Sequence, residues 1–210
     1  MPKTIKNKYF ECLTYDKLMK AHKKTEKGKR HKEEVIKFNL KQEEYIIWLL
    51  EQLKNKTYKH SGYKTFYITK PKLRKIEKSR YIDRIVHRWY VDNFIKPYFE
   101  PQYINKSFAC IKNRGTHKAC LEVQKGMKKC KKKWNNYYIL KMDVTKYFQN
   151  IDKQILLKIL KRKIKDKNIL WLTNEIINST IEKKGIPIRK LQFPMFCQHI
   201  LKRIRSIYKT

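Results

Sequence analysis

The spacing of hydrophobic residues along the chain predicts a protein built mainly from amphipathic helices. Apolar side chains recur three or four positions apart in several stretches, which places them on one face of a helix. We expect helices over residues 12–24, from Asn39 through Leu53, from Ile82 to Phe94, from Thr116 to Met127, from Asp152 to Leu160 and around Leu172–Ile177. Pro97 follows the third of these and is expected to end it.

Alternation of polar and apolar residues predicts a β-hairpin and one further strand. Tyr63–Ile68 alternates as a strand does, and Lys70–Lys72 supplies a turn around a proline. A second strand is expected through Arg74 and Ile76. Tyr138–Lys141 is a short β-prone run far along the chain. Helices together with these strands predict an α+β fold.

The net charge of the chain indicates which kind of molecule it is expected to bind. The 210 residues include 53 lysines and arginines against 18 acidic residues, a formal net charge of +35. A field of this sign attracts polyanions, and nucleic acid is the first candidate. Lysine, asparagine, isoleucine and tyrosine have A/T-rich codons, so a bias in base composition would account for part of the charge. A hydrophobic content of 41% supports a real core.

Cysteine usage and the N-terminal sequence bear on the compartment. The five cysteines are Cys12, Cys110, Cys120, Cys130 and Cys197, with no Cys-x-x-Cys pair and no histidine at zinc spacing. They are interpreted as reduced thiols, so a cytoplasmic location is expected. The opening MPKTIKNKYF has no apolar signal region, and no apolar run is long enough for a membrane span. We therefore expect no membrane partner.

The segment Tyr138–Asp152 carries the most informative chemistry in the chain. Asp143 follows the β-prone run, and a carboxylate at the end of a buried strand is costly unless it meets a cation. In so basic a protein, a metal ion near a phosphate is the usual reason for such a carboxylate. The alternative is an ordinary strand end with a capping aspartate. Asp152 is expected to cap the helix that follows.

Two basic segments are suited to phosphate groups. Lys70, Lys72 and Arg74 belong to the expected strand–turn–strand, where cations can grip phosphates. The alternative is a solvated basic hairpin. Arg114 precedes a Gly-Thr helix start whose free N–H groups suit a phosphate, although a plain turn with an N-cap explains the same residues. Asp83 is interpreted as the partner of its neighbour Arg84 in a structural ion pair.

Four blocks, in this order and spacing, resemble the opening motifs of reverse transcriptases of the bacterial retron and group II intron type. They are FYITKPKLRKIEKSRYIDRIVHR (66–88), SFACIKNRGTHKA (107–119), YILKMDVTKYFQNID (138–152) and KGIPI (184–188). The resemblance covers roughly residues 9–188. It implies an incomplete right-hand polymerase, with the fingers and an N-terminal helical region in residues 1–135 and the start of the palm in 136–188.

The resemblance implies an RNA-directed DNA polymerase, which adds deoxynucleoside triphosphates to a primer on an RNA template with two Mg²⁺ ions. Asp143 would be catalytic and would bind metal together with the carbonyl of Val144. Phe148 would occupy the place of the steric gate, where a flat ring lies against the sugar and excludes a 2′-hydroxyl. No oligomeric state is implied.

The same resemblance assigns the basic residues to two groups. Lys72, Arg74 and Arg114, with Phe148, would contact the incoming nucleotide. Lys70, Arg84 and Lys112 would contact the nucleic acid.

The chain departs from the family after residue 188. Family members carry a Tyr-x-Asp-Asp hairpin downstream of the Gly-Ile-Pro-Ile block, whereas this chain has no Asp-Asp pair and no acidic residue after Glu182. Residues 189–210 match nothing in the family. Back-translated with freely chosen synonymous codons and read one nucleotide later, they give GNYNSQCFANIYLNELDQYIK, which resembles the family's continuation. We interpret 189–210 as an out-of-frame tail, and the alternative is a genuine basic tail for nucleic acid.

These observations give an expected function and its competitors. The truncated chain is expected to be inactive as a polymerase, because the second acidic pair is absent. A non-catalytic RNA- or DNA-binding protein derived from a fingers domain is the alternative, and a basic ribonucleoprotein component bound through charge alone is the third. Without the strands that would flank Tyr138–Lys141, an exposed sheet edge is expected.

Overall fold

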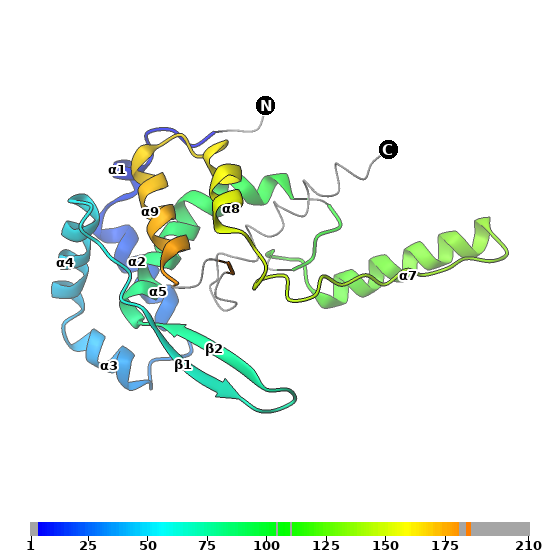
Figure 1. Ribbon diagram of the computed structural model, residues 1–210, viewed down its shortest axis with the longest axis horizontal. Coiled ribbons are helices and arrows are strands. Elements are labelled where there is room, and N and C mark those ends of the chain that lie inside the picture. Colours follow the sequence, from blue (N-terminus) through cyan, green and yellow to red (C-terminus); the bar gives the residue numbers. More distant parts are fainter. Residues whose placement is uncertain (1–3, 104, 110, 181–183, 186–210) are drawn as a thin grey trace.

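The computed structural model describes residues 4–103, 105–109, 111–180 and 184–185, and these form a mixed helical and β structure (Figure 1). The helices are α1 (Tyr9–Cys12), α2 (Tyr15–Glu26), α3 (Glu33–Leu40), α4 (Gln42–Lys54), α5 (Tyr81–Tyr90), α6 (Lys96–Phe99), α7 (Thr116–Lys133), α8 (Lys153–Lys161) and α9 (Lys167–Asn178), with a π-helical turn η1 (Val91–Ile95) and a 3-10 turn η2 (Glu100–Gln102). The strands β1 (Tyr63–Ile68) and β2 (Arg74–Ser79) form one antiparallel hairpin. The α+β expectation is confirmed at this coarse level.

Most helices pack into one unit, here called the helical body, which comprises residues 4–58, 81–103 and 151–180. Its largest fully buried side chains include Tyr9, Trp89, Tyr90, Phe94 and Phe99. Four of these five come from α5 and the turns that follow it, so this run is the centre of the core. Burying such aromatic side chains is the largest favourable term available to a body of this size.

Hydrogen bonds from buried aromatic residues join segments that are distant in sequence. The indole N–H of Trp89 donates to the carbonyl of Cys12 at 2.9 Å, and the Tyr9 hydroxyl donates to the carbonyl of Leu53 at 2.8 Å. The hydroxyls of Tyr90 and Thr173 lie 2.6 Å apart. Because each polar tip is satisfied, these side chains can be buried without an unpaired donor.

Asp166 connects the beginning of the chain to α9. One carboxylate oxygen accepts the N–H groups of Lys8 and Tyr9 at 2.9 and 3.0 Å. The other accepts the N–H groups of Asn168 and Ile169, which makes Asp166 the N-cap of α9. Residues 136–180 therefore contribute α8 and α9 to the same core as α2 and α5, and the expected division at residue 135 stays a prediction.

Three sequence expectations about helix ends have clear outcomes. Asp152 caps α8 by accepting the N–H groups of Gln154 and Ile155 at 2.8 and 3.0 Å, as predicted. Pro97 does not end the helical run, because it lies in the first turn of α6, where its missing N–H is not needed. The helix expected from Asn39 begins instead at Gln42, because Asn39 lies within α3, where its amide donates to Glu26 at 3.1 Å.

Residues 116–150 form a second region, here called the arm. Figure 1 shows α7 projecting from the helical body, with residues 134–150 leading back toward α8. No side chain of α7 is buried, although Ala119, Cys120, Val123 and Met127 recur at helical spacing. The apolar face that predicted this helix therefore has no surface to cover it among the described residues.

The predicted strand at Tyr138–Lys141 is wrong, because this segment forms no strand and lies exposed. Tyr138 is 95% exposed and Leu140 is 80% exposed. A strand exists only when a neighbouring strand accepts and donates its backbone hydrogen bonds, and none of the described residues supplies that neighbour. An exposed sheet edge was expected here. The structure instead has a single exposed segment that is not part of a sheet.

The remaining expectations concern the tail and the membrane. The predicted out-of-frame tail, residues 189–210, lies outside the described residues. Among the residues that the structure does describe, no helix is both long and apolar enough to cross a bilayer.

Candidate nucleic-acid interface

The distal end of the hairpin contains three of the predicted cationic residues. β1 and β2 pair from Tyr63↔Ser79 at the base to Ile68↔Arg74 at the far end. Lys70 and Lys72 lie in the connection between the strands, and both side chains are exposed. Arg74 is the first residue of β2. The expected basic strand–turn–strand is therefore present, and its contact with phosphates stays a prediction.

The base of the hairpin is fixed to the helical body. The Tyr63 hydroxyl lies 2.5 Å from the hydroxyl of Ser179, just after α9. The ring of His60 stacks on that of Tyr63, with centroids 4.6 Å apart. Because the base is held and the turn is exposed, the hairpin is a projecting finger with a positively charged end (Figure 1).

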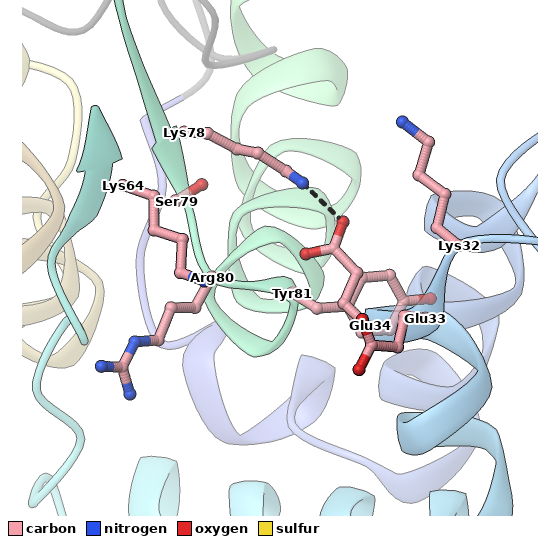
Figure 2. A pocket seen from close by; sticks show the side chains of 8 residues that line it. All are labelled: Lys32, Glu33, Glu34, Lys64, Lys78, Ser79, Arg80 and Tyr81. Atoms are coloured by element: carbon pink, nitrogen blue, oxygen red, sulfur yellow. Dashed lines mark ion pairs between the residues drawn. The ribbon is translucent and has the colours of Figure 1, made fainter. Parts of the chain in front are cut away.

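Arg84 is held at the base of this finger by Glu34 of α3. The Arg84 Nη2 lies 2.6 Å from Glu34 Oε1, and its guanidinium lies over the ring of Tyr81 at 5.1 Å. Lys78 of β2 reaches the same oxygen at 2.8 Å, and Figure 2 shows this pair with Arg80 pointing away from it. Burial raises the pKa of Glu34, but its hydrogen bonds to Lys78 and Arg84 outweigh that effect and leave the pKa below its usual value.

The interpretation of Asp83 as the partner of Arg84 is wrong. Asp83 is completely buried and accepts hydrogen bonds from the hydroxyl of Tyr58 at 2.7 Å and the N–H of Ser61 at 3.3 Å. The ring of His60 is 3.9 Å from its other carboxylate oxygen. Adjacent residues on a helix point in different directions, so Asp83 faces the core while Arg84 faces α3.

Arg114 closes the loop that precedes α7. Its guanidinium donates from Nη1 to the carbonyls of Asn105 and Ser107 at 3.1 and 3.0 Å. Gly115 is the N-cap of α7, as the turn and helix start predicted, and Lys112 is exposed in the loop. A structural role for Arg114 is thus evident in the loop, and contact with a nucleotide stays a prediction.

The residues expected at the metal site lie on the return segment of the arm. Asp143 is exposed, and its Oδ1 accepts the N–H of Val144 at 2.9 Å. Phe148 is half-buried against the core, with its ring 5.5 Å from that of Tyr147. Within the described ranges, no three histidine, cysteine, aspartate or glutamate side chains gather as metal ligands do. Asp143 is a single carboxylate, so these residues alone do not fit a pair of Mg²⁺ ions.

The candidate residues therefore lie in three places, one of which is the loop before α7 with Lys112 and Arg114. The hairpin and the base of α5 carry Lys70, Lys72, Arg74 and Arg84, whereas the arm carries Asp143, Val144 and Phe148. Figure 1 shows the hairpin and the arm as separate projections from the helical body. The described structure does not unite them in one catalytic site.

A basic cavity lies beside the hairpin, and Arg84 is the one lining residue that had been singled out from the sequence as a site residue. The cavity, of about 720 Å³, lies between the hairpin, the α2–α3 connection and α5. Eight lysine or arginine side chains and one glutamate line it. One signal was present in the sequence, because Arg80, Arg84 and Arg88 recur every four residues and so follow one side of α5.

The comparisons with known proteins leave the family open. A scan against models of protein families found no family that matches the chain, and a search of curated proteins found no match either. The resemblance to reverse transcriptases consequently rests on the four sequence blocks themselves.

Proposed function

We propose that the chain is the fingers and the first part of the palm of an RNA-directed DNA polymerase. The intact enzyme would add deoxynucleotides to a primer paired with an RNA template. Of the carboxylates that would bind the two metal ions, this chain contains only Asp143. We therefore expect no primer extension from this chain alone. The four blocks of sequence are the basis for the proposal, and the described residues add support from one place.

The exposed segment Tyr138–Val144, which contains Asp143, is the structural observation that supports the proposal. Its exposed fractions are 95% for Tyr138, 66% for Ile139, 80% for Leu140, 81% for Met142 and 57% for Val144. Five exposed large apolar side chains within the seven residues Tyr138–Val144 mark a place where another structure belongs. Because the run is β-prone, the missing structure is best explained as neighbouring strands, as in a palm sheet whose central strand carries a metal-binding carboxylate.

The first test is the DNA sequence from codon 180 to several hundred bases downstream. The proposal expects a second frame, one nucleotide out of register, that continues through codons for Tyr-x-Asp-Asp. A confirmed tail with no such frame after it would contradict the proposed frameshift and leave the palm without its second carboxylate pair.

The second test uses the protein repaired by removal of one nucleotide near codon 188. We expect Asp143→Asn to lower primer extension on an RNA template by about a hundredfold or more, because the charge that binds metal is lost. RNA affinity should stay within about twofold, since an exposed carboxylate does not bind phosphate. Asp16→Asn removes an equally exposed carboxylate from α2 and is the matched control. Extension that survives Asp143→Asn would show that the metal site is assigned wrongly.

A non-catalytic RNA- or DNA-binding protein is the second candidate. The helical body and the hairpin favour it, because they pack around their own core and present cations without the arm. Binding of RNA by this chain, together with a reading frame that ends after residue 210, would make it the leading function. A preference for primer–template over single-stranded RNA would instead favour the polymerase.

A further inference from the structure

The cavity between the hairpin and the helical body has the composition of a phosphate-binding site. Among its eight basic residues, Lys24 pairs with Asp92 at 2.6 Å, and Lys78 and Arg84 both pair with Glu34. These three cations are paired with carboxylates of the protein, and the pairs join α2 to η1 and both β2 and α5 to α3.

The other five cations of the cavity have no such partner. Across the described residues, Lys27, Lys29, Lys32, Lys64 and Arg88 have no carboxylate within ion-pairing distance. The Nε of Arg88 is also buried without a hydrogen-bond partner. A buried guanidinium nitrogen left unpaired is costly, and an anion that enters the cavity would relieve this cost.

Mutual repulsion within the group is visible in Lys29. Burial lowers the pKa of Lys29 first, and the positive charges of Arg84, Lys32 and Arg88 lower it further, while Glu34 raises it. The cations therefore act on one another at close range. A polyanion would turn this unfavourable arrangement into a favourable one.

One wall of the cavity is apolar. Phe66 of β1 lines it and is 39% exposed, and Ile76 lies directly across the hairpin from Phe66. An accessible aromatic face among cations is the arrangement by which proteins bind single-stranded nucleic acid, with bases on the ring and phosphates on the cations.

A second hollow adjoins the cavity. This hollow of about 600 Å³ shares Lys32, Lys64 and Lys78 with the cavity, and its further lining comprises Glu33, Glu34, Arg80 and Tyr81 (Figure 2). Because Glu33 and Glu34 line this hollow, the phosphate contacts are assigned to the cavity itself.

We propose that this cavity binds a single-stranded RNA segment, with backbone phosphates on Lys29, Lys32 and Arg88 and a base against Phe66. The inference takes from the proposed function only that the ligand is a nucleic acid. It therefore applies equally if the protein is a non-catalytic RNA-binding protein. It gives the chain a contact with the strand that is independent of the hairpin turn and of Asp143.

The test is a salt titration with this chain and a fluorescent oligouridylate. For a single strand, each phosphate contact contributes roughly 0.7 to the slope of log affinity against log salt. Lys29→Gln combined with Arg88→Gln should lower that slope by about 1.4 and weaken binding roughly tenfold. Lys20→Gln combined with Lys54→Gln removes the same charge from exposed positions of α2 and α4 and should change neither quantity.

A third variant separates the aromatic contact from the charges. Phe66→Leu keeps an apolar side chain in the hairpin, and it should weaken binding roughly tenfold while leaving the salt slope unchanged. Equal losses in the cavity variant and its control would overturn the proposal, because binding would then depend on total charge alone. Wild-type affinity and slope in the cavity variant would overturn it as well.

Protection of lysines from acetylation tests the site without any substitution. The oligouridylate should protect Lys29 and Lys32, but not Lys20 or Lys54, and unprotected Lys29 and Lys32 would count against the site. The same measurement is made with a nucleoside triphosphate and with inorganic pyrophosphate, which carry phosphate without an RNA strand. Stronger protection of Lys29 and Lys32 by either compound than by the oligouridylate would show that the ligand is not an RNA strand. These experiments measure binding and not polymerisation. A failure of the cavity to bind RNA would therefore leave the proposed polymerase function untouched, and a negative result in the reading-frame test would leave the cavity proposal untouched.

Discussion

The helical body and the arm have similar apolar patterns in sequence but differ in what covers them. In the body, Trp89 is completely buried and its indole N–H is satisfied by a carbonyl of α1. In the arm, Trp134 at the end of α7 is 51% exposed and lies against the ammonium group of Lys133. The difference teaches that an amphipathic pattern predicts a helix but does not supply the partner that the apolar face needs.

The carboxylates of the two regions differ in the same way. Asp166 in the body accepts four backbone N–H groups from two segments. Asp143 in the arm accepts one N–H, from the residue beside it. A carboxylate that joins distant segments contributes to folding, whereas an exposed one with a local bond is free for a role with a ligand.

The largest effect expected from this comparison comes from the two tryptophans. Trp89→Ala should lower the free energy of unfolding by about 3–5 kcal/mol, because it empties a large buried volume. Trp134→Ala should change it by less than about 0.5 kcal/mol. Urea denaturation followed by far-UV circular dichroism measures both. Similar losses in the two variants would mean that the arm is packed in solution.

The aspartates give the next largest effect. Asp166→Ala removes a helix cap and two links to the N-terminal segment, so it should cost about 2–4 kcal/mol. Asp143→Ala should stay within about 0.5 kcal/mol of wild type. The midpoints of urea denaturation of the two variants and the wild type measure these differences in stability. A stable Asp166→Ala protein would show that the N-terminal segment is not held by this carboxylate.

The smallest effect concerns the ion pairs at the base of the hairpin. The pKa of Glu34 is lowered in the folded state, so its contribution is complete above its ordinary pKa and is lost as the pH falls through the lowered value. Glu34→Gln should therefore cost about 1 kcal/mol near pH 7 and flatten the loss of stability between about pH 5 and 3. Melting temperatures across this pH range measure it.

The arm provides the control for that experiment. Glu122 pairs with Lys125 on the surface of α7 at 3.2 Å, and its replacement by glutamine should leave the profile almost unchanged. An equal flattening in both variants would assign the effect to net charge and not to the hairpin base.

Much of the fold could be predicted because the signals are local. The apolar spacing of Ile46, Leu49 and Leu53 predicted α4, and alternation from Tyr63 to Ile68 predicted β1. Asp152 was predicted as a cap from its position alone, and its geometry agrees. In each case the residues that form the element also contain the information for it.

The candidate site was predictable only in part. Lys70 and Lys72 lie at the exposed end of the hairpin, as a turn between alternating strands implies. Asp83 was misassigned, because its true partners, Tyr58 and Ser61, are more than twenty residues away in sequence. The basic cavity was missed for the same reason, since its cations come from α2, the α2–α3 connection, β1, β2 and α5.

The sequence by itself determined most of the helices (α3 was not expected), the hairpin, the large positive charge and the four blocks that resemble a polymerase. Tertiary structure alone decided which apolar faces are covered, which carboxylates are shared between segments and which cations meet around a cavity. The physical reason is the range of the interactions. Helix periodicity and caps act within a few residues, but burial, strand pairing and charge clustering depend on segments that only folding brings together.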